Sequence, residues 1–458
     1  MRPTPIAFAT LALALLASCG GGVTSPDENV PKISFSSQVT FGDSLSDVGT
    51  YAVGKVRELG GGTYNINGDN RTINAALTGK NWTELMASRL GQAAPCAAQT
   101  GLDGDDKLGY FVPVVNHAGC FGYAQGGARV SNPVGSEHKA TGSALGQLTV
   151  PAATQIRNHL AAVGGRFKGD EIVFVMAGGN DLLALLRELQ SGAGKVAADA
   201  GAAAFADSLV KQLAAGASDV AAAMQAVGAA LAAESARAGH TADSVVGAAV
   251  LAAAGQPGNA AVGAPAVYGP LVLKAKADGE AAGAKAGADY AALRGPAMVA
   301  TMAATGKELV ALVKEQLLAK GANYVTVNNL PDVATSPAGL LQPAASRQLI
   351  MAMVGAFNGE LSTGLAGEAK VLLVDVYAIS HDQASNPAAY GLSNVKEMAC
   401  DLEPLKNALH SSLVCNGGNL AAGDVSHYAF ADDVHPTPYN YLLLARHVAE
   451  KMVLKGWL

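Results

Sequence analysis

The sequence is poor in aromatic and charged residues. Only 5% of its 458 residues are aromatic and 15% are charged, whereas 50% are hydrophobic. Much of the apolar content is therefore alanine, so we expect well-packed helices around a core of Val, Leu and Ile. The net charge is −6, and nothing suggests the basic patch of a nucleic-acid-binding protein. The GxxxxGK[ST] phosphate loop, the HExxH zinc motif and the GxSxG elbow of α/β-hydrolases are also absent.

The first residues predict an export signal. Arg2 precedes a short apolar run, 6–16, which is too short for a comfortable transmembrane span. The Leu-Ala-Ser-Cys that follows looks like a bacterial lipobox, which would make Cys19 the lipid-modified first residue of the mature protein; the alternative is an ordinary cleaved signal with a stray cysteine. We therefore expect a lipoprotein signal peptide at 1–19 and a flexible Gly- and Pro-rich tether at 20–35. The protein is then exported to the outer membrane or cell surface, or released, and its anchor contacts the membrane.

The remaining cysteines are assigned to structure rather than to catalysis. Export places them in an oxidising compartment, where an even number favours two disulfides. Three pairings are possible, and the sequence-local one closes the shortest loops. We therefore expect Cys96–Cys120 and Cys400–Cys415, with four reduced, buried cysteines as the alternative.

Short β-branched apolar runs predict a buried parallel sheet of five strands. Helical patterns lie between the runs, and this alternation predicts an α/β fold with helices on both faces of the sheet. Ligands bind such sheets beyond the carboxyl ends of the strands, where the polar motifs fall. The expected strands are 38–41, 111–115, 171–176, 323–327 and 370–376.

The segment 187–289 departs from this alternation. It is rich in Ala and Gly, it lacks a convincing strand, and apolar residues between Phe205 and Leu231 recur at helical spacing. Long insertions between strands are unusual and often functional. We predict a helical insertion and hypothesise that it forms a cap over the active site; the alternative is a solvent-facing helical decoration.

Two polar motifs near opposite ends of the chain predict a nucleophile and its base. The sequence FGDSLSD places Ser44 at a strand-to-helix turn, where its hydroxyl needs an adjacent base. The sequence ADDVHPT places Asp432 three residues before His435, so the carboxylate can bind one imidazole nitrogen and leave the other free to accept a serine proton. Taken singly, the first motif is also a helix-capping turn and the second a solvated loop.

Two glycine-containing motifs predict donors to an oxyanion. AGGND follows the strand at 171–176, and the side-chain amide of Asn180 can donate to developing negative charge. YAQGGA, at 123–128, lets the backbone approach a substrate oxygen closely. An Asx turn and a tight turn are the respective alternatives.

Together, the blocks FGDSLSDVG, YAQGGA, GGND and FADDVHPT resemble the GDSL lipase/esterase family, also called SGNH hydrolases. The resemblance covers about 36–186 and 290–458. It is nearest to the bacterial secreted branch of lipases, phospholipases and lipid acyltransferases. It implies a three-layer α/β/α, flavodoxin-like fold and a single hydrolase domain at 36–458.

The resemblance also implies a role for each site residue. Ser44 would be the nucleophile, His435 the base and Asp432 its partner. The Ser44 N–H, the Gly127 N–H and the Asn180 side chain would form the oxyanion hole, with Gly126 as the alternative to Gly127. Gly122 stands where the family often has asparagine, so hydrogen bonding in this block is expected to differ.

The predicted activity is hydrolysis of a carboxylic ester through an acyl-serine intermediate. The lipid anchor and the apolar insertion favour hydrophobic esters at an interface, such as lipids or polyesters. Lipid acyl transfer or phospholipase activity would use the same residues, and a non-catalytic surface binding protein is the remaining alternative. The chemistry requires no metal and no organic cofactor, the histidines show no metal-binding spacing, and no oligomeric state is indicated.

Overall fold

The computed structural model describes residues 33–68 and 79–458. The predicted signal peptide, Cys19 and most of the tether lie outside the described residues. The lipobox therefore stays a prediction.

A four-stranded parallel sheet organises the part of the chain outside the long insertion. Its order is β1-β4-β5-β6, and each neighbouring pair is parallel. Every residue of β1 and β4 is buried, as their apolar, β-branched sequences predict. The strands are β1 (Gln38–Gly42), β4 (Ile172–Met176), β5 (Tyr324–Asn328) and β6 (Val371–Val374).

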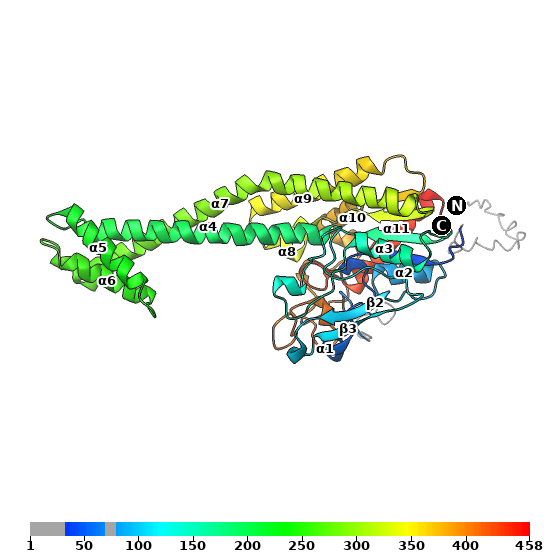
Figure 1. Cartoon of the computed structure of the whole chain (residues 1–458), viewed down its shortest axis with the longest axis horizontal. Helices are drawn as coiled ribbons and strands as arrows, with labels where there is room; N and C mark the ends of the chain where they lie inside the picture. The colour runs from blue at the N-terminus through cyan, green and yellow to red at the C-terminus, as the bar shows by residue number, and fades with distance from the viewer. Residues whose placement is uncertain (1–32, 69–78) are drawn as a thin grey trace, which may run out of the picture.

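Side chains alternate along β4 between two separate apolar cores, which shows that helices cover both faces of the sheet. Val173 and Val175 pack with α3 (Ala152–Ala162), α9 (Ala344–Gly364) and the end of α7 (Pro265–Ala311). Phe174 and Met176 pack on the opposite face with α2 (Trp82–Arg89) and α11 (Pro438–Lys455). The result is an α/β/α arrangement of three layers (Figure 1).

The expectation of a fifth strand at 111–115 is wrong. That run forms β3 (Phe111–Asn116), which pairs antiparallel with β2 (Gln99–Asp103) in a hairpin outside the main sheet. β3 is largely exposed, and it contains Pro113, which cannot donate to a central ladder. Beside β1, the Thr40 N–H donates to the Phe121 carbonyl, and the Tyr123 N–H donates to the Thr40 carbonyl, but this contact is a single bridge rather than a strand.

Smaller elements surround the carboxyl ends of the strands. β7 and β8 form a second two-stranded pair, which is parallel. α10 follows β6 directly, as expected for a strand–helix unit. The bounds are α1 (Gly54–Glu58), α8 (Pro337–Leu340), α10 (Val376–Ser385), β7 (Asn394–Met398) and β8 (Tyr428–Phe430).

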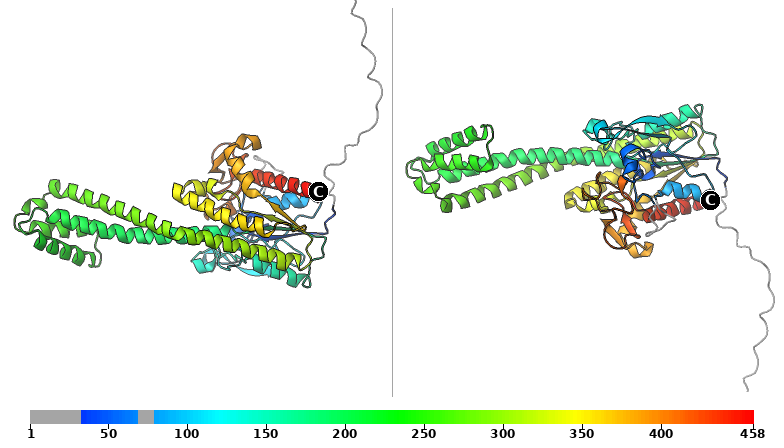
Figure 2. Two further views of the ribbon diagram at one scale, coloured as in Figure 1. Left: turned by 90° about the horizontal axis from the view of Figure 1, so that it is seen from above. Right: turned by 90° about the horizontal axis from the view of Figure 1, so that it is seen from below.

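The insertion forms a long helical arm. α4 (Gly179–Ala214) leaves the sheet as one helix of 36 residues, and α7 returns beside it for 47 residues before a π-helical segment, Leu312–Leu318. α5 (Val220–Ser235) and α6 (Ala242–Ala254) lie at the far end (Figures 1 and 2). By length and composition alone, the helix from Pro265 to Leu318 could cross a membrane, and about a third of its apolar window (33%) is buried against the rest of the protein.

Small residues allow the two long helices to approach closely. A Cβ atom added at Gly279 would lie 2.8 Å from the Gly201 carbonyl oxygen, and one added at Gly283 would lie 2.8 Å from that of Ala197. Such contacts require residues with little or no side chain. Close packing between α4 and α7 therefore explains the glycines at 201, 279 and 283.

The arm has its own core and contributes little to the cavity that contains Ser44. Leu209, Val227, Val250 and other apolar side chains of α4–α7 form a cluster separate from the two cores at the sheet. Of residues 187–289, only Arg187 lines the cavity that contains Ser44. The arm extends away from the sheet and the helices around it (Figure 1), so this structure does not show the hypothesised cap over that cavity. The reason is that α4 continues unbroken in the direction in which it leaves the sheet.

A buried histidine packs among aromatic rings beside β1. The His159 side chain packs against the rings of Phe41, Phe121, Tyr123 and Phe167, with ring centroids 4.8–5.7 Å apart. Neither of its ring nitrogens has a hydrogen-bond partner within residues 33–68 and 79–458. Burial lowers the pKa of His159 from 6.5 to about 4. The folded protein therefore holds this imidazole in its neutral form.

Replacing His159 by phenylalanine should make stability less sensitive to acid. In the wild type, the unfolded chain gains a proton as the pH falls below 6.5, while the folded chain does so only near 4. His159 thus contributes stability that is complete above pH 6.5 and is lost as the pH falls towards 4. The variant should reduce the drop in unfolding free energy between about pH 7 and about pH 4.5 by about 2–3 kcal/mol.

Urea unfolding at the two pH values measures this difference. His240→Phe is the control, because it makes the same substitution at an exposed histidine of the arm. An equal drop in His159→Phe and wild type would show that His159 does not titrate on unfolding.

Candidate active site

The structure brings the two ends of the sequence together at the carboxyl end of β1. Ser44 begins a short 3-10 turn directly after β1, and the preceding Asp43 caps that turn by accepting the Leu45 N–H at 3.1 Å. The Ser44 Oγ lies 2.8 Å from His435 Nε2, although 391 residues separate them. His435 Nδ1 lies 2.8 Å from Asp432 Oδ2 and 2.9 Å from Oδ1. The three side chains therefore form a continuous hydrogen-bonded line.

The Asp432 carboxylate is buried but well supplied with donors. Its Oδ1 accepts the N–H groups of Val434 and His435 at 3.1 and 2.8 Å, and its Oδ2 accepts the Ser412 N–H at 2.8 Å. Burial would raise the pKa of Asp432, but the charge of His435 and these hydrogen bonds outweigh it and hold the pKa below its usual range. Asp432 is therefore a carboxylate that accepts only, which orients the N–H of the His435 ring.

The pKa of His435 is raised above 6.5. Burial opposes the charged imidazolium, but the charge of Asp432, its hydrogen bond, and the nearby Asp433 and Asp43 together favour it. The ring of Tyr64 lies 4.8 Å from the His435 ring. A Cβ atom at Gly126 would lie 2.0 Å from the Tyr64 hydroxyl, so glycine is needed there for Tyr64 to support the imidazole.

Hydrogen bonding distinguishes Gly127 from Gly126 as the candidate backbone donor. The Gly126 N–H donates to Asp47 Oδ2 at 2.9 Å and is therefore occupied. The Gly127 N–H has no hydrogen-bond partner among the described residues, and Gly127 lines the cavity with a φ of +77°. The Ser44 N–H likewise donates to no atom in the described part of the chain. Two residues that line the cavity with the serine hydroxyl therefore have backbone N–H groups without a partner in the described part of the chain.

Asn180 is the second residue of α4 and lines the same cavity. Its Nδ2 donates to the Ala128 carbonyl at 3.0 Å, which leaves a second amide hydrogen for a ligand. A helix N-terminus also favours negative charge nearby. The site thus presents three donors around one serine hydroxyl, an arrangement suited to an oxyanion.

Gly122, which stands where the resembling family often has asparagine, lies in a crowded position. A Cβ atom at this position would lie 2.7 Å from Val48 Cγ2 and 2.8 Å from the Cys96 carbonyl oxygen. The Gly122 N–H donates to that carbonyl at 3.1 Å. Asparagine would not fit, and backbone bonds to the Cys96 segment hold this block instead.

The cavity has a volume of about 900 Å³ and is mainly apolar. It contains Ser44, Gly127, Asn180 and His435 at one place, and its apolar walls include Leu183 of α4, Leu330 after β5 and Ile379 of α10. No cluster of three metal-ligating side chains occurs within 33–68 and 79–458. The cavity accommodates a hydrophobic ligand with one polar group held at the serine.

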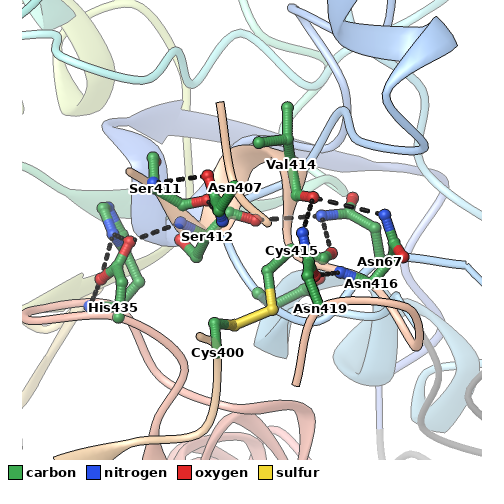
Figure 3. Close-up of a disulfide and its surroundings, with 12 residues drawn as sticks. Asn67, Cys400, Asn407, Ser411, Ser412, Val414, Cys415, Asn416, Asn419 and His435 are labelled. Carbon is green, nitrogen blue, oxygen red and sulfur yellow. Dashed lines mark hydrogen bonds and ion pairs between the residues drawn. A yellow bond between two sulfur atoms is a disulfide. The ribbon is translucent and has the colours of Figure 1, made fainter. Parts of the chain in front are cut away.

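Both sequence-local disulfides are present. Cys96 is bonded to Cys120, and Cys400 is bonded to Cys415. They indicate an oxidising, exported environment. Figure 3 shows the second disulfide beside the loop that carries Ser412, whose N–H holds Asp432. Asn67 Nδ2 also donates to the Ser412 and Cys415 carbonyls, at 3.1 and 3.0 Å, and so fixes the same loop.

Replacing Cys400 and Cys415 by serine should lower both stability and turnover. The disulfide closes a loop of about 15 residues, for which the chain-entropy contribution is about 3 kcal/mol. Because the loop also positions the Ser412 N–H, we expect kcat to fall about tenfold. Thermal unfolding and ester hydrolysis measure the two effects.

The comparison is the Cys96→Ser/Cys120→Ser pair, which removes the disulfide beside the Gly122 block instead of the one beside the Ser412 loop. It should lower the melting temperature and lower kcat less than the Cys400→Ser/Cys415→Ser pair. Equal losses of kcat in the two double variants would contradict a specific role for the Cys400–Cys415 loop.

Several contributors to the site are invisible in the sequence. Ser412 acts through its backbone N–H, for which any residue type would serve. Tyr64 and Gln147 form a pair, with Gln147 Nε2 donating to the Tyr64 hydroxyl at 2.6 Å, and neither lies in a recognisable motif. The Ser136 hydroxyl contacts the Asn180 side chain, and Arg187 in turn contacts the Ser136 hydroxyl. Only their position in the fold identifies them.

Part of the chain has known relatives. Over 136 residues it is 30% identical to Esterase EstA of Pseudomonas aeruginosa and, to the same extent, to Esterase EstA of Pseudomonas putida. The chain is distantly similar to an esterase. The match covers 27% of this chain and 19% of each relative, so the chain spans about a fifth of the length of these esterases. No family model matches the chain.

Proposed function

We propose that this protein is a serine carboxylic-ester hydrolase of the GDSL/SGNH type, with its hydrolase domain at 36–458. The observation that carries the proposal is the line from Ser44 Oγ through His435 to Asp432, lying in a cavity with free N–H donors. The partial likeness to an esterase supports the same reaction class. In this proposal Ser44 is the nucleophile, His435 is the base and Asp432 is the carboxylate that orients His435.

In the proposed reaction, Ser44 Oγ attacks the ester carbonyl carbon while His435 Nε2 takes the hydroxyl proton. The carbonyl oxygen becomes an oxyanion, which accepts hydrogen bonds from the Ser44 N–H, the Gly127 N–H and the Asn180 amide. The C–O bond to the alcohol then breaks, and His435 gives its proton to the leaving alkoxide. Water, deprotonated by His435, cleaves the acyl-serine to a carboxylic acid and restores the Ser44 hydroxyl.

The apolar cavity favours esters with a hydrophobic acyl or alcohol part, such as lipids or polyesters. Acyl transfer to an alcohol, or cleavage of a phospholipid acyl ester, would use the same residues. An exported protein with a lipidated Cys19 would meet such substrates at a membrane surface. This part of the proposal rests on the sequence alone, since Cys19 is outside the described residues.

A panel of p-nitrophenyl esters with short, medium and long acyl chains tests the proposal. The protein should release p-nitrophenol, and an alkyl fluorophosphonate should label Ser44 and stop the reaction. Product analysis with added alcohol separates hydrolysis from acyl transfer. Failure to hydrolyse any ester, together with absence of labelling, would instead favour a non-catalytic binding protein.

A further inference from the structure

Two residues outside the proposed catalytic set are linked to the Asn180 amide, Ser136 directly and Arg187 through Ser136. Arg187 Nη2 lies 2.8 Å from Ser136 Oγ, and Ser136 Oγ lies 3.4 Å from Asn180 Oδ1. Asn180 Nδ2 meanwhile donates to the Ala128 carbonyl at 3.0 Å. The amide is therefore held at both of its polar atoms.

The direction of each hydrogen bond follows from the chemistry of the groups. A guanidinium only donates, so Ser136 Oγ must accept from Arg187. The single hydroxyl hydrogen of Ser136 is then directed at Asn180 Oδ1, which can only accept. Asn180 Oδ1 is thereby occupied by the Ser136 hydroxyl, and the second Nδ2 hydrogen is the polar hydrogen of the amide that is left for a substrate oxygen.

The loop that carries Ser136 is held in an unusual shape. The next residue, Glu137, has a φ of +57°, in the left-handed region that non-glycine residues rarely adopt. The Gln147 N–H donates to the Glu137 carbonyl at 2.8 Å, and the Gly135 N–H donates to Thr149 Oγ1 at 3.3 Å. Backbone strain of this kind persists only where surrounding contacts enforce it, and it occurs often at active sites.

Arg187 reaches Ser136 from the helix that begins at the oxyanion donor. It lies seven residues after Asn180 on α4, two turns further along the same face of the helix. One rigid helix thus carries both the donor and the cation that orients it.

We propose that Ser136 and Arg187 are positioning residues for the oxyanion donor Asn180, with Arg187 acting through the Ser136 hydroxyl. The inference rests on the proposed function, because it assigns these residues to the same reaction. Neither residue needs to touch the substrate. Their effect is to hold the amide plane so that its free hydrogen points at the oxyanion as it forms.

Steady-state kinetics on p-nitrophenyl butyrate, with wild type as reference, tests this assignment. Removing a whole oxyanion donor typically costs 10²–10³ in kcat, so Asn180→Ala should fall by about that factor. Ser136→Ala should lower kcat by about tenfold with KM within about twofold, and Arg187→Ala by about threefold. Ser136→Thr, which keeps a hydroxyl, should recover most of the loss. An alkylboronic acid, which mimics the tetrahedral intermediate, should bind Ser136→Ala about tenfold more weakly.

Double variants separate positioning from general structural damage. Ser136→Ala/Arg187→Ala should match Ser136→Ala alone, and Ser136→Ala should change kcat by less than about twofold in an Asn180→Ala background. Ser131→Ala, on the same loop with its hydroxyl bonded to Glu308 Oε2, is the matched control and should keep wild-type kcat.

Two results would overturn the proposal. One is a Ser136→Ala loss that is equally large when Asn180 is already alanine. The other is an Arg187→Ala effect confined to KM, which would make Arg187 a substrate-binding residue. If Ser44→Ala retained full activity, the proposed function itself would fail. This measurement does not involve Ser136, so the failure of the proposed function can be told apart from the failure of the positioning role.

Discussion

Replacing Ser44 by alanine is expected to lower kcat by about four orders of magnitude or more, because its hydroxyl is the one bonded to His435 Nε2 among the residues that the structure describes. The change removes one oxygen atom from a side chain that is 8% exposed, so the fold should be retained. Hydrolysis of p-nitrophenyl butyrate measures the loss. Mass spectrometry of the fluorophosphonate-treated protein should show one adduct in the wild type and none in the variant.

The second serine of the same turn is the control for this experiment. Ser46 Oγ accepts the indole N–H of Trp82 at 3.1 Å in a buried setting and has no contact with His435. Ser46→Ala should therefore reduce stability while leaving labelling and kcat near wild type. Turnover by Ser44→Ala within tenfold of the wild type would end the assignment of Ser44 as nucleophile.

The sheet was largely predictable because its strands are buried on both faces. A run such as Ile172–Met176 is continuously apolar, and few other structures accommodate such a run. The run at 111–115 has a similar composition but lies in an exposed hairpin. Pro113 was the available signal against a central strand, since it removes one ladder hydrogen bond.

The direction of the arm could not be predicted, because periodicity reports which face of a helix is apolar but not where the helix points. α4 is about 50 Å long at 1.5 Å per residue. Its course is set by its first turn at Gly179 and by contacts between glycines of α4 and α7. The composition of the segment was therefore enough to predict helices. To predict whether they cover the cavity, one would have had to know the direction in which α4 leaves the sheet.

The groups of the proposed site were predictable where chemistry demands a particular side chain, and not where a backbone atom suffices. Ser44, Asp432 and His435 stand in motifs whose residue types matter. The Ser412 N–H, which contacts Asp432, has no such signature. The choice between Gly126 and Gly127 likewise needed the structure, because it depends on which N–H is already bonded to Asp47.

Asp432→Asn should lower kcat/KM by about 10⁴ and move its pH dependence to lower pH. The amide nitrogen of asparagine can donate to His435 Nδ1, which would place the ring proton on Nε2, where the Ser44 proton must be accepted. In the wild type, the raised pKa of His435 means that activity increases with pH through a midpoint above 6.5, as the imidazole becomes neutral. Without the negative charge of Asp432, burial remains and lowers that pKa, so the residual activity should rise at a lower pH.

Rates measured from about pH 5 to about pH 9 in both proteins test the magnitude and the direction together. Asp433→Asn is the matched control, because Asp433 also raises the pKa of His435 but makes no hydrogen bond to it. It should shift the midpoint slightly to lower pH and keep most of kcat. A wild-type rate that is flat between about pH 5 and 8 would show that proton transfer through His435 does not limit the reaction. An Asp432→Asn variant that keeps a tenth of the activity would show that Asp432 does not orient His435.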